Sequence, residues 1–439
     1  MSWKSTLKKA AAQQEFCRPA FTTEKIDWAR VVTVDFETYF GVEYTLKKMS
    51  TSEYIRDDRF KAQMVGIKIG KGKTKVYGPK QIGAALRAIN WQTHSLLAHN
   101  CVPGDTEVLT RSGWKQIKDV PQTAEIMQWD PTTQALSWCV PLAKIKNKAK
   151  ELVSWGSSFH RGQYTAGHRM YFQTPDKAEW QVDTAENVAK RSMNNTYIPL
   201  SGYYAGSTDG ALTEAEARLM EAIRADGSWR ITDGAFYGVQ FNIRKDRKAA
   251  RLHKLCVAVG VDLSEPDARG RMHIRRTQAP VLAKLFELLG LNKTYGCWLI
   301  EQPLAIRQAV LEELIFWDGH ETGKKGFQWS TASYMTATTI ETVAHVSGWR
   351  VSGTWRDNAR GFNAKNPGAL LFVATVTQTS RAKLVNKPTV KKHSGAVYCF
   401  TVPTGAFLMR AGGRICVTGN CAFDGLILSH HYGIIPARY

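Results

Sequence analysis

Two short stretches, far apart in the chain, determine how the sequence divides: Cys-Val-Pro-Gly-Asp-Thr at residues 101–106 and Val-Thr-Gly-Asn-Cys at residues 417–421. Residues 95–100, before the first stretch, have the pattern of a strand that ends in polar residues, and residues 422–428, after the second, have that of an amphipathic helix start. Removing everything between the two stretches would join Asn100 directly to Cys421. The sequence therefore predicts an insertion, residues 101–420, between two halves of one host sequence.

The composition indicates a globular, nucleic-acid-binding chain. The 439 residues suffice for two to four domains, and 59 Lys and Arg against 38 Asp and Glu give a net charge of +21. A charge of this size favours nucleic acid as partner, with a membrane surface as the weaker alternative. No apolar run is long enough to span a membrane, and the N-terminus lacks the apolar core of a secretory signal. We expect a cytoplasmic protein of a bacterial or phage-infected cell, with its eight cysteines as thiols.

The boundary residues of the insertion resemble those of an intein, a self-splicing protein insertion. An intein begins with Cys or Ser, ends with Asn and is followed by Cys, Ser or Thr, and here the three positions are Cys101, Asn420 and Cys421. The resemblance implies that the Cys101 thiol converts the peptide bond after Asn100 into a thioester, that Cys421 accepts the acyl group, and that Asn420 cyclises and cuts the chain. Splicing on this scheme requires no cofactor.

Two internal stretches resemble intein blocks as well. Gly-Gln-Tyr-Thr-Ala-Gly-His at residues 162–168 resembles the Thr-x-x-His block, which implies that Thr165 and His168 polarise the scissile amide, with His168 as general acid. Residues 396–402 resemble the penultimate block, although Cys399 stands where many members have Asp. The chain departs from the intein pattern at two places that bear on the cleavage at Asn420. Gly419 replaces the usual penultimate His, and residues 403–407 contain no His. We expect slower cleavage at Asn420, but splicing nonetheless.

A zinc site is the alternative interpretation of these residues. It would use thiols and an imidazole from Cys101, Cys139, Cys399, Cys416 and His168. Their spacing lacks the close Cys pairs that are typical of zinc modules. The pattern therefore favours reacting groups over metal ligands.

The middle of the insertion contains an internal duplication. An apolar helix ending in Asp226-Gly227 is followed by strand-like and helical segments, and a second helix ending in Asp318-Gly319 is followed by the same order of segments. This duplication resembles the LAGLIDADG homing endonucleases. The resemblance implies that the two helices pack side by side and that Asp226 and Asp318 hold Mg²⁺ over the two scissile phosphates of duplex DNA.

Basic residues in the strands of the duplicated unit are candidates for DNA contacts. In this family the strands form a saddle whose Arg and Lys side chains reach phosphates and base edges. The candidates are Arg230, Arg244, Lys245, Arg275, Arg276, Lys324 and Lys325. We expect duplex DNA as the partner and site-specific cleavage of both strands as the activity.

The two flanks resemble the start of a proofreading-type 3′–5′ exonuclease. A β-branched run from residue 29 leads into Asp35-Phe-Glu37, and the spacing of two places both carboxylates on one face of a strand. Further strands are expected at 64–70, 74–77 and 95–100, with a helix at 81–90. Joining Asn100 to Cys421 completes a second motif that contains Asp424. The resemblance implies that Asp35, Glu37 and Asp424 hold Mg²⁺ for hydrolysis of a single-stranded DNA 3′ end, in the amino-terminal part of a phage-type family A DNA polymerase exonuclease.

The predicted architecture is multidomain. An RNase H-like α/β fragment would comprise residues 1–100 and 421–439, an all-β splicing domain of the Hint type residues 101–204 and 385–420, and an α/β endonuclease of two αββαββα repeats residues 205–384. We expect a monomer that acts as a self-splicing enzyme with DNA endonuclease activity. Two alternatives stay open: an exonuclease-like nuclease with a permanent DNA-binding insertion, and a DNA-binding protein whose nuclease sites have decayed.

Overall fold

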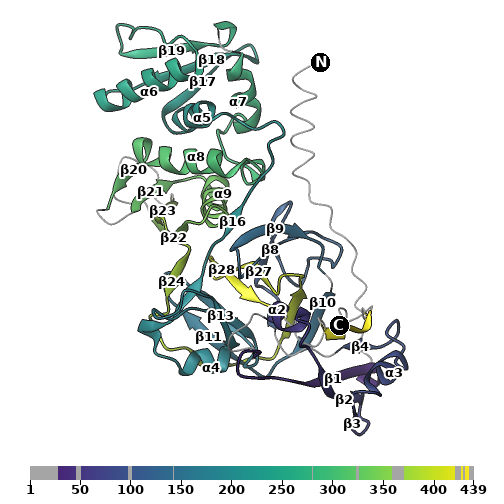
Figure 1. The fold of residues 1–439 in the computed structure, drawn as a ribbon. Coiled ribbons are helices and arrows are strands. Elements are labelled where there is room, and N and C mark those ends of the chain that lie inside the picture. The colour runs from purple at the N-terminus through teal and green to yellow at the C-terminus, as the bar shows by residue number, and fades with distance from the viewer. Residues whose placement is uncertain are drawn as a thin grey trace.

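The computed structural model describes residues 28–45, 51–96, 101–141, 143–278, 280–322, 326–357, 370–420, 427–428 and 431–434. These residues form a mixed fold that is rich in sheet and contains few helices. Figure 1 shows three parts: a small sheet formed by residues 31–96, a β-rich part in the middle, and a part with two helix-and-sheet layers at the far end.

The chain ends contribute one small sheet with strand order β3-β2-β1-β4. Strand β1 runs antiparallel to β2 and parallel to β4. Apolar side chains alternate along β1 with exposed ones, and they share a core with Ile427 and Leu428 from the other end of the chain. The elements are η1 (Trp28–Arg30), β1 (Val31–Thr38), α2 (Thr51–Arg56), β2 (Ala62–Ile69), β3 (Lys75–Tyr77), α3 (Ile82–Arg87) and β4 (Ser95–Leu96).

The middle part is built from short strands that come from two separate stretches of chain. The first stretch contributes β5 (Val102–Pro103), β6 (Glu107–Thr110), β7 (Gly113–Gln116), β8 (Ile126–Trp129), β9 (Ala135–Cys139), β10 (Ala143–Lys148), β11 (Glu151–Gly156), β12 (Arg161–Tyr164), β13 (Arg169–Phe172), β14 (Gln181–Thr184), α4 (Ala185–Lys190), η2 (Met193–Asn195), β15 (Tyr197–Pro199) and β16 (Tyr203–Tyr204). The second contributes β24 (Arg381–Lys383), β25 (Thr389–Lys392), β26 (Ala396–Thr401), β27 (Ala406–Ala411) and β28 (Arg414–Gly419).

The returning strands interleave with the early ones. Strand β26 lies between β10 and β5, β25 pairs with β11, and β24 pairs with β15. The β27–β28 hairpin joins the largest sheet, where β27 pairs with β6 and β8. The start and the end of the insertion therefore fold together, and the predicted boundary at residue 385 falls just after β24.

The far part contains the duplicated helices, α5 and α8, packed side by side (Figure 1). Helix α5 begins with a capping box in which Thr213 accepts from the backbone N–H of Glu216 and the Glu216 carboxylate accepts from that of Thr213. The first copy comprises α5 (Glu214–Asp226), β17 (Gly227–Thr232), β18 (Ala235–Asn242), α6 (Asp246–Val259), β19 (Arg271–Arg275), η3 (Arg276–Gln278) and α7 (Val281–Leu289), and η4 (Cys297–Leu299) follows it. The second comprises α8 (Leu304–Trp317), β20 (Gly319–Glu321), β21 (Gly326–Thr331), α9 (Tyr334–His345), β22 (Arg350–Asp357) and β23 (Leu370–Thr377).

The two copies differ in their sheets. The second has the expected two pairs of strands, in the order β20-β21-β23-β22. The first has a three-stranded sheet, β17-β18-β19, so its described residues do not show the fourth strand of the predicted repeat. After β19 the chain turns through η3 into α7, whose Leu282, Leu285 and Leu289 are buried in the core. Helix α7 matches the final helix of the predicted repeat, so only the short η3 lies where the fourth strand was expected.

One hydrophobic core joins the middle and far parts. Trp129, Leu408 and Val417 of the β-rich part belong to the same buried cluster as Ile340 and Val343 of α9. Across this boundary the Trp114 indole N–H donates to the Thr342 hydroxyl at 2.8 Å. Among the described residues, no helix is both long and apolar enough to cross a membrane.

Candidate functional site

The first residue of the insertion is held by Thr165. The backbone N–H of Cys101 donates to the Thr165 hydroxyl at 3.0 Å, and the backbone N–H of Thr165 donates to the Cys101 carbonyl at 3.1 Å. Thr165 follows directly on β12, and the Cys101 side chain is buried. The two residues are 64 positions apart, so the fold, not the local chain, brings them together.

His168 links this contact to the other end of the insertion. Its backbone N–H donates to the Thr165 carbonyl at 2.9 Å, and its Nε2 lies 2.7 Å from the Thr418 hydroxyl on β28. The ring is fully buried, and its Nδ1 has no hydrogen-bond partner among the described residues. Burial, aided by the charge of Arg169, lowers the pKa of His168 to about 3. The imidazole is therefore neutral at pH 7 and carries one ring N–H, and its general-acid role stays a prediction.

Asn420, the last residue of the insertion, is fully buried. Its backbone N–H donates to the Gly405 carbonyl at 3.0 Å, and its side-chain amide donates to the Val402 carbonyl at 2.9 Å. Its side-chain oxygen has no hydrogen-bond partner among the described residues. A continuous path of hydrogen bonds thus runs from Cys101 through Thr165 and His168 to Thr418, two residues before Asn420.

The predicted residue Cys399 lies beside the start of the insertion. Strand β26 pairs with β5 so that Tyr398, next to Cys399, lies opposite Val102, next to Cys101. Both thiols are buried in the same cluster. The five residues of the alternative zinc site are all described, and no three metal-ligating side chains come together anywhere in the described part of the chain. Asn100, Cys421 and Asp424 lie outside the described residues.

Thr418 and Tyr171 are two side chains that the sequence interpretation missed. The Tyr171 hydroxyl lies beside Gly405, the residue whose carbonyl accepts from Asn420, and burial raises its pKa, so the phenol stays protonated. A β-carbon at Gly405 would be 3.3 Å from this hydroxyl and 3.9 Å from the Asn420 side-chain oxygen. No local pattern marks either residue. Thr418, for example, contacts His168, which is 250 positions away in the chain.

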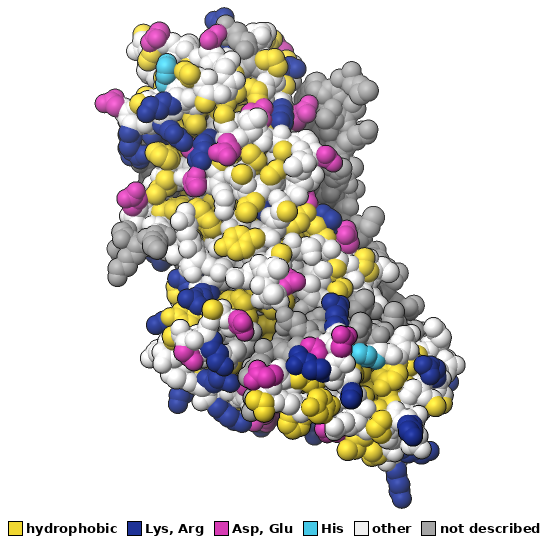
Figure 2. Space-filling view, viewed as in Figure 1, with side chains coloured by type: hydrophobic (Ala, Val, Ile, Leu, Met, Phe, Trp, Pro, Cys, Tyr) yellow, Lys and Arg dark blue, Asp and Glu magenta, His cyan; other side chains and the backbone are white. Residues whose placement is uncertain are grey.

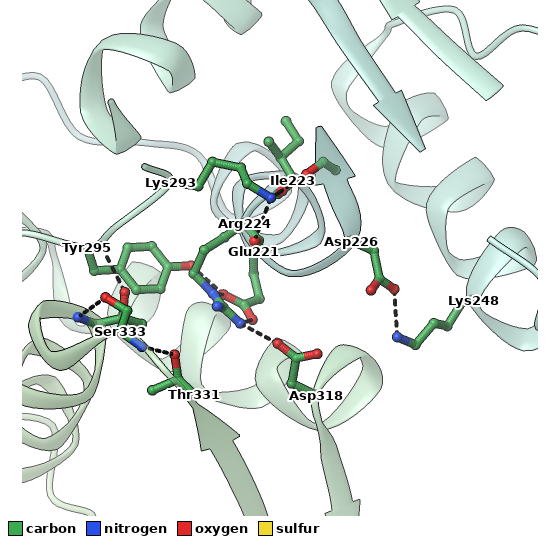
Figure 3. Close-up of polar contacts among 12 residues, drawn as sticks. Glu221, Ile223, Arg224, Asp226, Lys248, Lys293, Tyr295, Asp318, Thr331 and Ser333 are labelled. Carbon is green, nitrogen blue, oxygen red and sulfur yellow. Dashed lines mark hydrogen bonds and ion pairs between the residues drawn. The ribbon is translucent and has the colours of Figure 1, made fainter. Parts of the chain in front are cut away.

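The helix-end carboxylates Asp226 and Asp318 each contact a cation. Asp226, the last residue of α5, lies 2.6 Å from the Lys248 ammonium of α6. Asp318, which follows α8, lies 2.9 Å from the Arg224 guanidinium of α5 (Figure 3). The helices pack side by side, but each terminal carboxylate faces a cation. Arg224 extends from α5 to Asp318, and Lys248 of α6 reaches Asp226.

Arg224 is itself held by a buried network. Its Nε and Nη2 donate to the two carboxylate oxygens of Glu221 at 2.7 and 2.8 Å, and the Tyr295 hydroxyl donates to the same carboxylate at 2.5 Å. Burial raises the pKa of Glu221, against the lowering effect of Arg224. Burial acts to lower the pKa of Arg224, but the charge of Glu221 outweighs it and the net shift is upward. Arg224 therefore stays charged between Glu221 and Asp318.

The proposed DNA-contacting side chains lie at the surface of the first copy. The predicted residues, which are all exposed, are Arg230, Arg244, Lys245, Arg275 and Arg276; Lys324 and Lys325 fall outside the described residues. Arg230 and Arg275 both pair with Gly238 in the β17-β18-β19 sheet, on the face opposite the core. Burial, and then the charge of Arg230, lower the pKa of His273 on the same face. Figure 2 shows further Lys and Arg side chains gathered around α6.

The host carboxylates lie as the alternation predicts. Asp35 and Glu37 are both exposed on the face of β1 that points away from the core. They lie next to the paired residues Gly66 and Met64 of β2. Two carboxylates on one strand face are a partial metal-ligand set, and the third predicted member, Asp424, is outside the described residues.

Comparisons with known proteins give low-identity similarities of two kinds. No family model matches the chain. The ribonucleoside-diphosphate reductase subunit beta of Aquifex aeolicus is 23% identical over 372 residues, which cover 73% of this chain and 50% of that protein. The chain thus spans about half the length of this curated relative.

Solved structures similar to the chain include an intein and a DNA endonuclease. A splice-inactive variant of the AceL NrdHF class 3 split intein is 12% identical, covers 73% of this chain and 97% of its own, and has a TM-score of 0.24. Mesophilic variants of the homing endonuclease I-DmoI are 12% identical, cover 37% and 88%, and have a TM-score of 0.27. I-DmoI in complex with DNA and Mn is 11% identical, covers 37% and 89%, and has a TM-score of 0.26.

Proposed function

We propose that residues 101–420 splice themselves out of the chain and join Asn100 to Cys421. The observation that carries this proposal is the path of hydrogen bonds from Cys101 through Thr165 and His168 to Thr418. A permanently inserted domain has no need to bring its first and last residues to one buried cluster of reactive side chains. Self-splicing does need this, because both ends react in one sequence of steps.

The first step forms a thioester at the start of the insertion. The Cys101 sulfur adds to the carbonyl carbon of Asn100, the bond from that carbon to the Cys101 nitrogen breaks, and the thiol proton ends on the freed amine. The Thr165 hydroxyl already accepts from the amide N–H that breaks away. The neutral His168, whose Nδ1 has no hydrogen-bond partner among the described residues, supplies a hydrogen bond to the same peptide group.

The later steps transfer the acyl group and release the insertion. The Cys421 sulfur displaces the Cys101 sulfur from the thioester, which regenerates the Cys101 thiol. The side-chain nitrogen of Asn420 then attacks its own carbonyl carbon, which breaks the bond to Cys421 and leaves a cyclic imide. The freed amine of Cys421 finally displaces its own sulfur and forms the new amide. The Val402 and Gly405 carbonyls hold the Asn420 amide groups for this attack.

The mass of the expressed chain tests the proposal. The wild type should yield a ligated product of residues 1–100 and 421–439 together with free 101–420. The Cys101→Ala variant should stay an unspliced precursor of 49.1 kDa. Cys139→Ala is the matched control, since Cys139 lies apart from the path of hydrogen bonds, and it should splice like the wild type. An intact wild-type chain after prolonged incubation would instead favour a permanent insertion.

We propose a second function for the far part, recognition of duplex DNA in the manner of the LAGLIDADG homing endonucleases. The supporting observations are the packed pair α5–α8 and the exposed Arg230 and Arg275 on one sheet face. Binding through such groups should weaken steeply with salt, and Arg230→Ala with Arg275→Ala should reduce the salt dependence. Cleavage of both strands would further require Mg²⁺ at the helix ends.

For the flanks we propose the amino-terminal part of a 3′–5′ exonuclease that belongs to a phage-type DNA polymerase. Asp35 and Glu37 support it, as two carboxylates exposed on one strand face. Splicing would add Asp424, join the interrupted motif and so allow Mg²⁺-dependent hydrolysis of a single-stranded DNA 3′ end. Mn²⁺ titration of the spliced product, compared with Asp35→Asn, tests this assignment.

A further inference from the structure

We infer that the paired helices α5 and α8 hold their terminal carboxylates in ion pairs with Arg224 and Lys248 in place of a divalent metal, so that this part recognises duplex DNA without cutting it. The inference rests on the proposed DNA recognition and concerns how the same site works. It departs from the resemblance, which implies Mg²⁺ at Asp226 and Asp318.

One oxygen of each carboxylate that a metal would need already accepts from a cation. Mg²⁺ takes six oxygen ligands in near-octahedral geometry. One carboxylate oxygen of Asp318 lies 2.9 Å from Arg224, and one of Asp226 lies 2.6 Å from Lys248. The carbonyl oxygens at the end of α5 are occupied as well, because the Lys293 ammonium donates to those of Ile223, Arg224 and Gly227 (Figure 3).

Arg224 cannot leave its place at low cost. Its side chain is 7% exposed and that of Glu221 is fully buried. Moving the guanidinium out to admit a metal would leave the buried Glu221 carboxylate without its counter-ion, which is strongly unfavourable. The Tyr295 hydroxyl would be the only remaining partner that the described residues give the Glu221 carboxylate.

The local charge balance also disfavours a divalent cation. Three carboxylates lie at this end of the helix pair, Glu221, Asp226 and Asp318, and three cations face them. The cations are Arg224, Lys248 and Lys293. A metal-binding site carries an excess of negative charge, whereas this cluster is neutral before any metal arrives.

The neighbouring glutamate of α8 repeats the arrangement. Glu313 precedes Asp318 by the same five positions that separate Glu221 from Asp226, and its side chain is fully buried as well. It accepts from Arg251 and lies 3.4 Å from Arg218. Both helices therefore carry a buried glutamate in an internal ion pair, five positions before the terminal aspartate.

Mn²⁺ titration followed by electron paramagnetic resonance, on a precursor held intact by Cys101→Ala and Asn420→Ala, tests the inference. At each total Mn²⁺ concentration, the free Mn²⁺ should be the same for this protein as for the same protein with Asp226→Asn and Asp318→Asn. The apolar replacement Arg224→Met with Glu221→Leu should gain a Mn²⁺ site that Asp318→Asn removes again. A Mn²⁺ site in the unaltered cluster that Asp318→Asn abolishes would overturn the inference, as would the absence of any gain in the apolar replacement.

Binding to DNA is measured separately on the same precursor. The probe is a duplex that encodes the uninterrupted junction of Asn100 and Cys421, compared with a duplex of scrambled sequence. Affinity should not rise when Mg²⁺ replaces a chelator, because the proposed contacts to phosphates and bases need no metal and Mg²⁺ competes with them as a counterion. Equal affinity for both duplexes would refute the proposed DNA recognition and leave the Mn²⁺ result standing, whereas Mg²⁺-dependent cleavage that Asp226→Asn abolishes would refute the inference alone.

Discussion

The residue before Asn420 is a glycine, and the backbone of β13 explains why. A β-carbon at Gly419 would lie 2.4 Å from the Arg169 carbonyl oxygen and 3.0 Å from the Arg169 β-carbon. No side chain fits there unless β13 or β28 moves. The histidine that intein sequences usually carry at this position is therefore excluded by packing, and the Asn420 amide is held by the Val402 and Gly405 carbonyls.

Introducing the usual histidine should harm the last splicing step. Gly419→His should slow cleavage after Asn420 by about tenfold or more, since a displaced backbone at this position costs upwards of about 1.4 kcal/mol. The rate is measured from the decay of the precursor band and the appearance of free 101–420. Gly419→Ala, which introduces the same β-carbon without the imidazole, should show a similar loss. Faster cleavage in the histidine variant would contradict this explanation.

Thr418 should matter for the first step, although no intein block predicts it. Thr418→Val removes the only hydroxyl that contacts His168 Nε2 among the described residues, and leaving a buried polar atom unpaired costs about 1–3 kcal/mol. Thioester formation, measured by thiol-induced cleavage between Asn100 and Cys101, should fall by about five- to a hundredfold. Thr418→Ser retains the hydroxyl and should behave like the wild type. Equal cleavage rates in Thr418→Val and wild type would argue against a positioning role.

At the scale of elements, the helix pair α5–α8 depends on buried ion pairs as well as on apolar contact. Glu313 lies inside α8 with a fully buried side chain and accepts from the Trp317 indole at 3.1 Å besides its contacts with Arg218 and Arg251. Its neighbour Glu312 is 48% exposed and pairs with Arg218 only at the surface. The two adjacent glutamates thus provide a matched comparison of a buried and an exposed pair.

Glu313→Gln should lower the free energy of unfolding by about 3 kcal/mol, because two arginines lose a buried counter-ion. Glu312→Gln should cost less than about 1 kcal/mol, as for other exposed pairs. Denaturant unfolding of the Cys101→Ala precursor measures both. Equal effects of the two substitutions would show that burial does not govern this network.

Periodicity predicted much of these elements but not their contacts. The helix over α5, the paired strands after it and the alternation along β1 all follow from apolar spacing and from caps such as Thr213. The missing fourth strand of the first copy, where η3 lies between β19 and α7, was not predicted from the apolar spacing. Nor were the partners of Asp226 and Asp318, since Arg224 and Lys248 reach them through packing that no local pattern encodes.

At the scale of the whole molecule, three histidines of the described part of the chain are buried in the neutral form. Burial lowers the pKa of His160 and His345 to about 4 and that of His168 to about 3. His345 of α9 joins two parts of the molecule, because its Nδ1 lies 2.7 Å from the Leu200 carbonyl of the β-rich part. In the folded chain each ring is buried, so its protonated form would be a charge without access to water.

The precursor should therefore lose stability in mild acid. Unfolded histidines titrate near pH 6.5, so between that pH and about 4 the unfolded chain binds more protons than the folded one. Each buried histidine then contributes a loss of about 1.4 kcal/mol per pH unit as the pH falls. Urea unfolding at pH 7 and pH 5 measures the change, and His345→Gln should make the slope shallower. A free energy of unfolding that stays constant between these two pH values would contradict the assignment.

The core shared by the β-rich part and α9 has a consequence for inheritance. A deletion of the helix-rich segment would bare Trp129, Leu408 and Val417, which now pack against it. If residues 101–420 splice as proposed, a shortened insertion without the helix-rich segment would carry this apolar face exposed to solvent until polar residues replaced it.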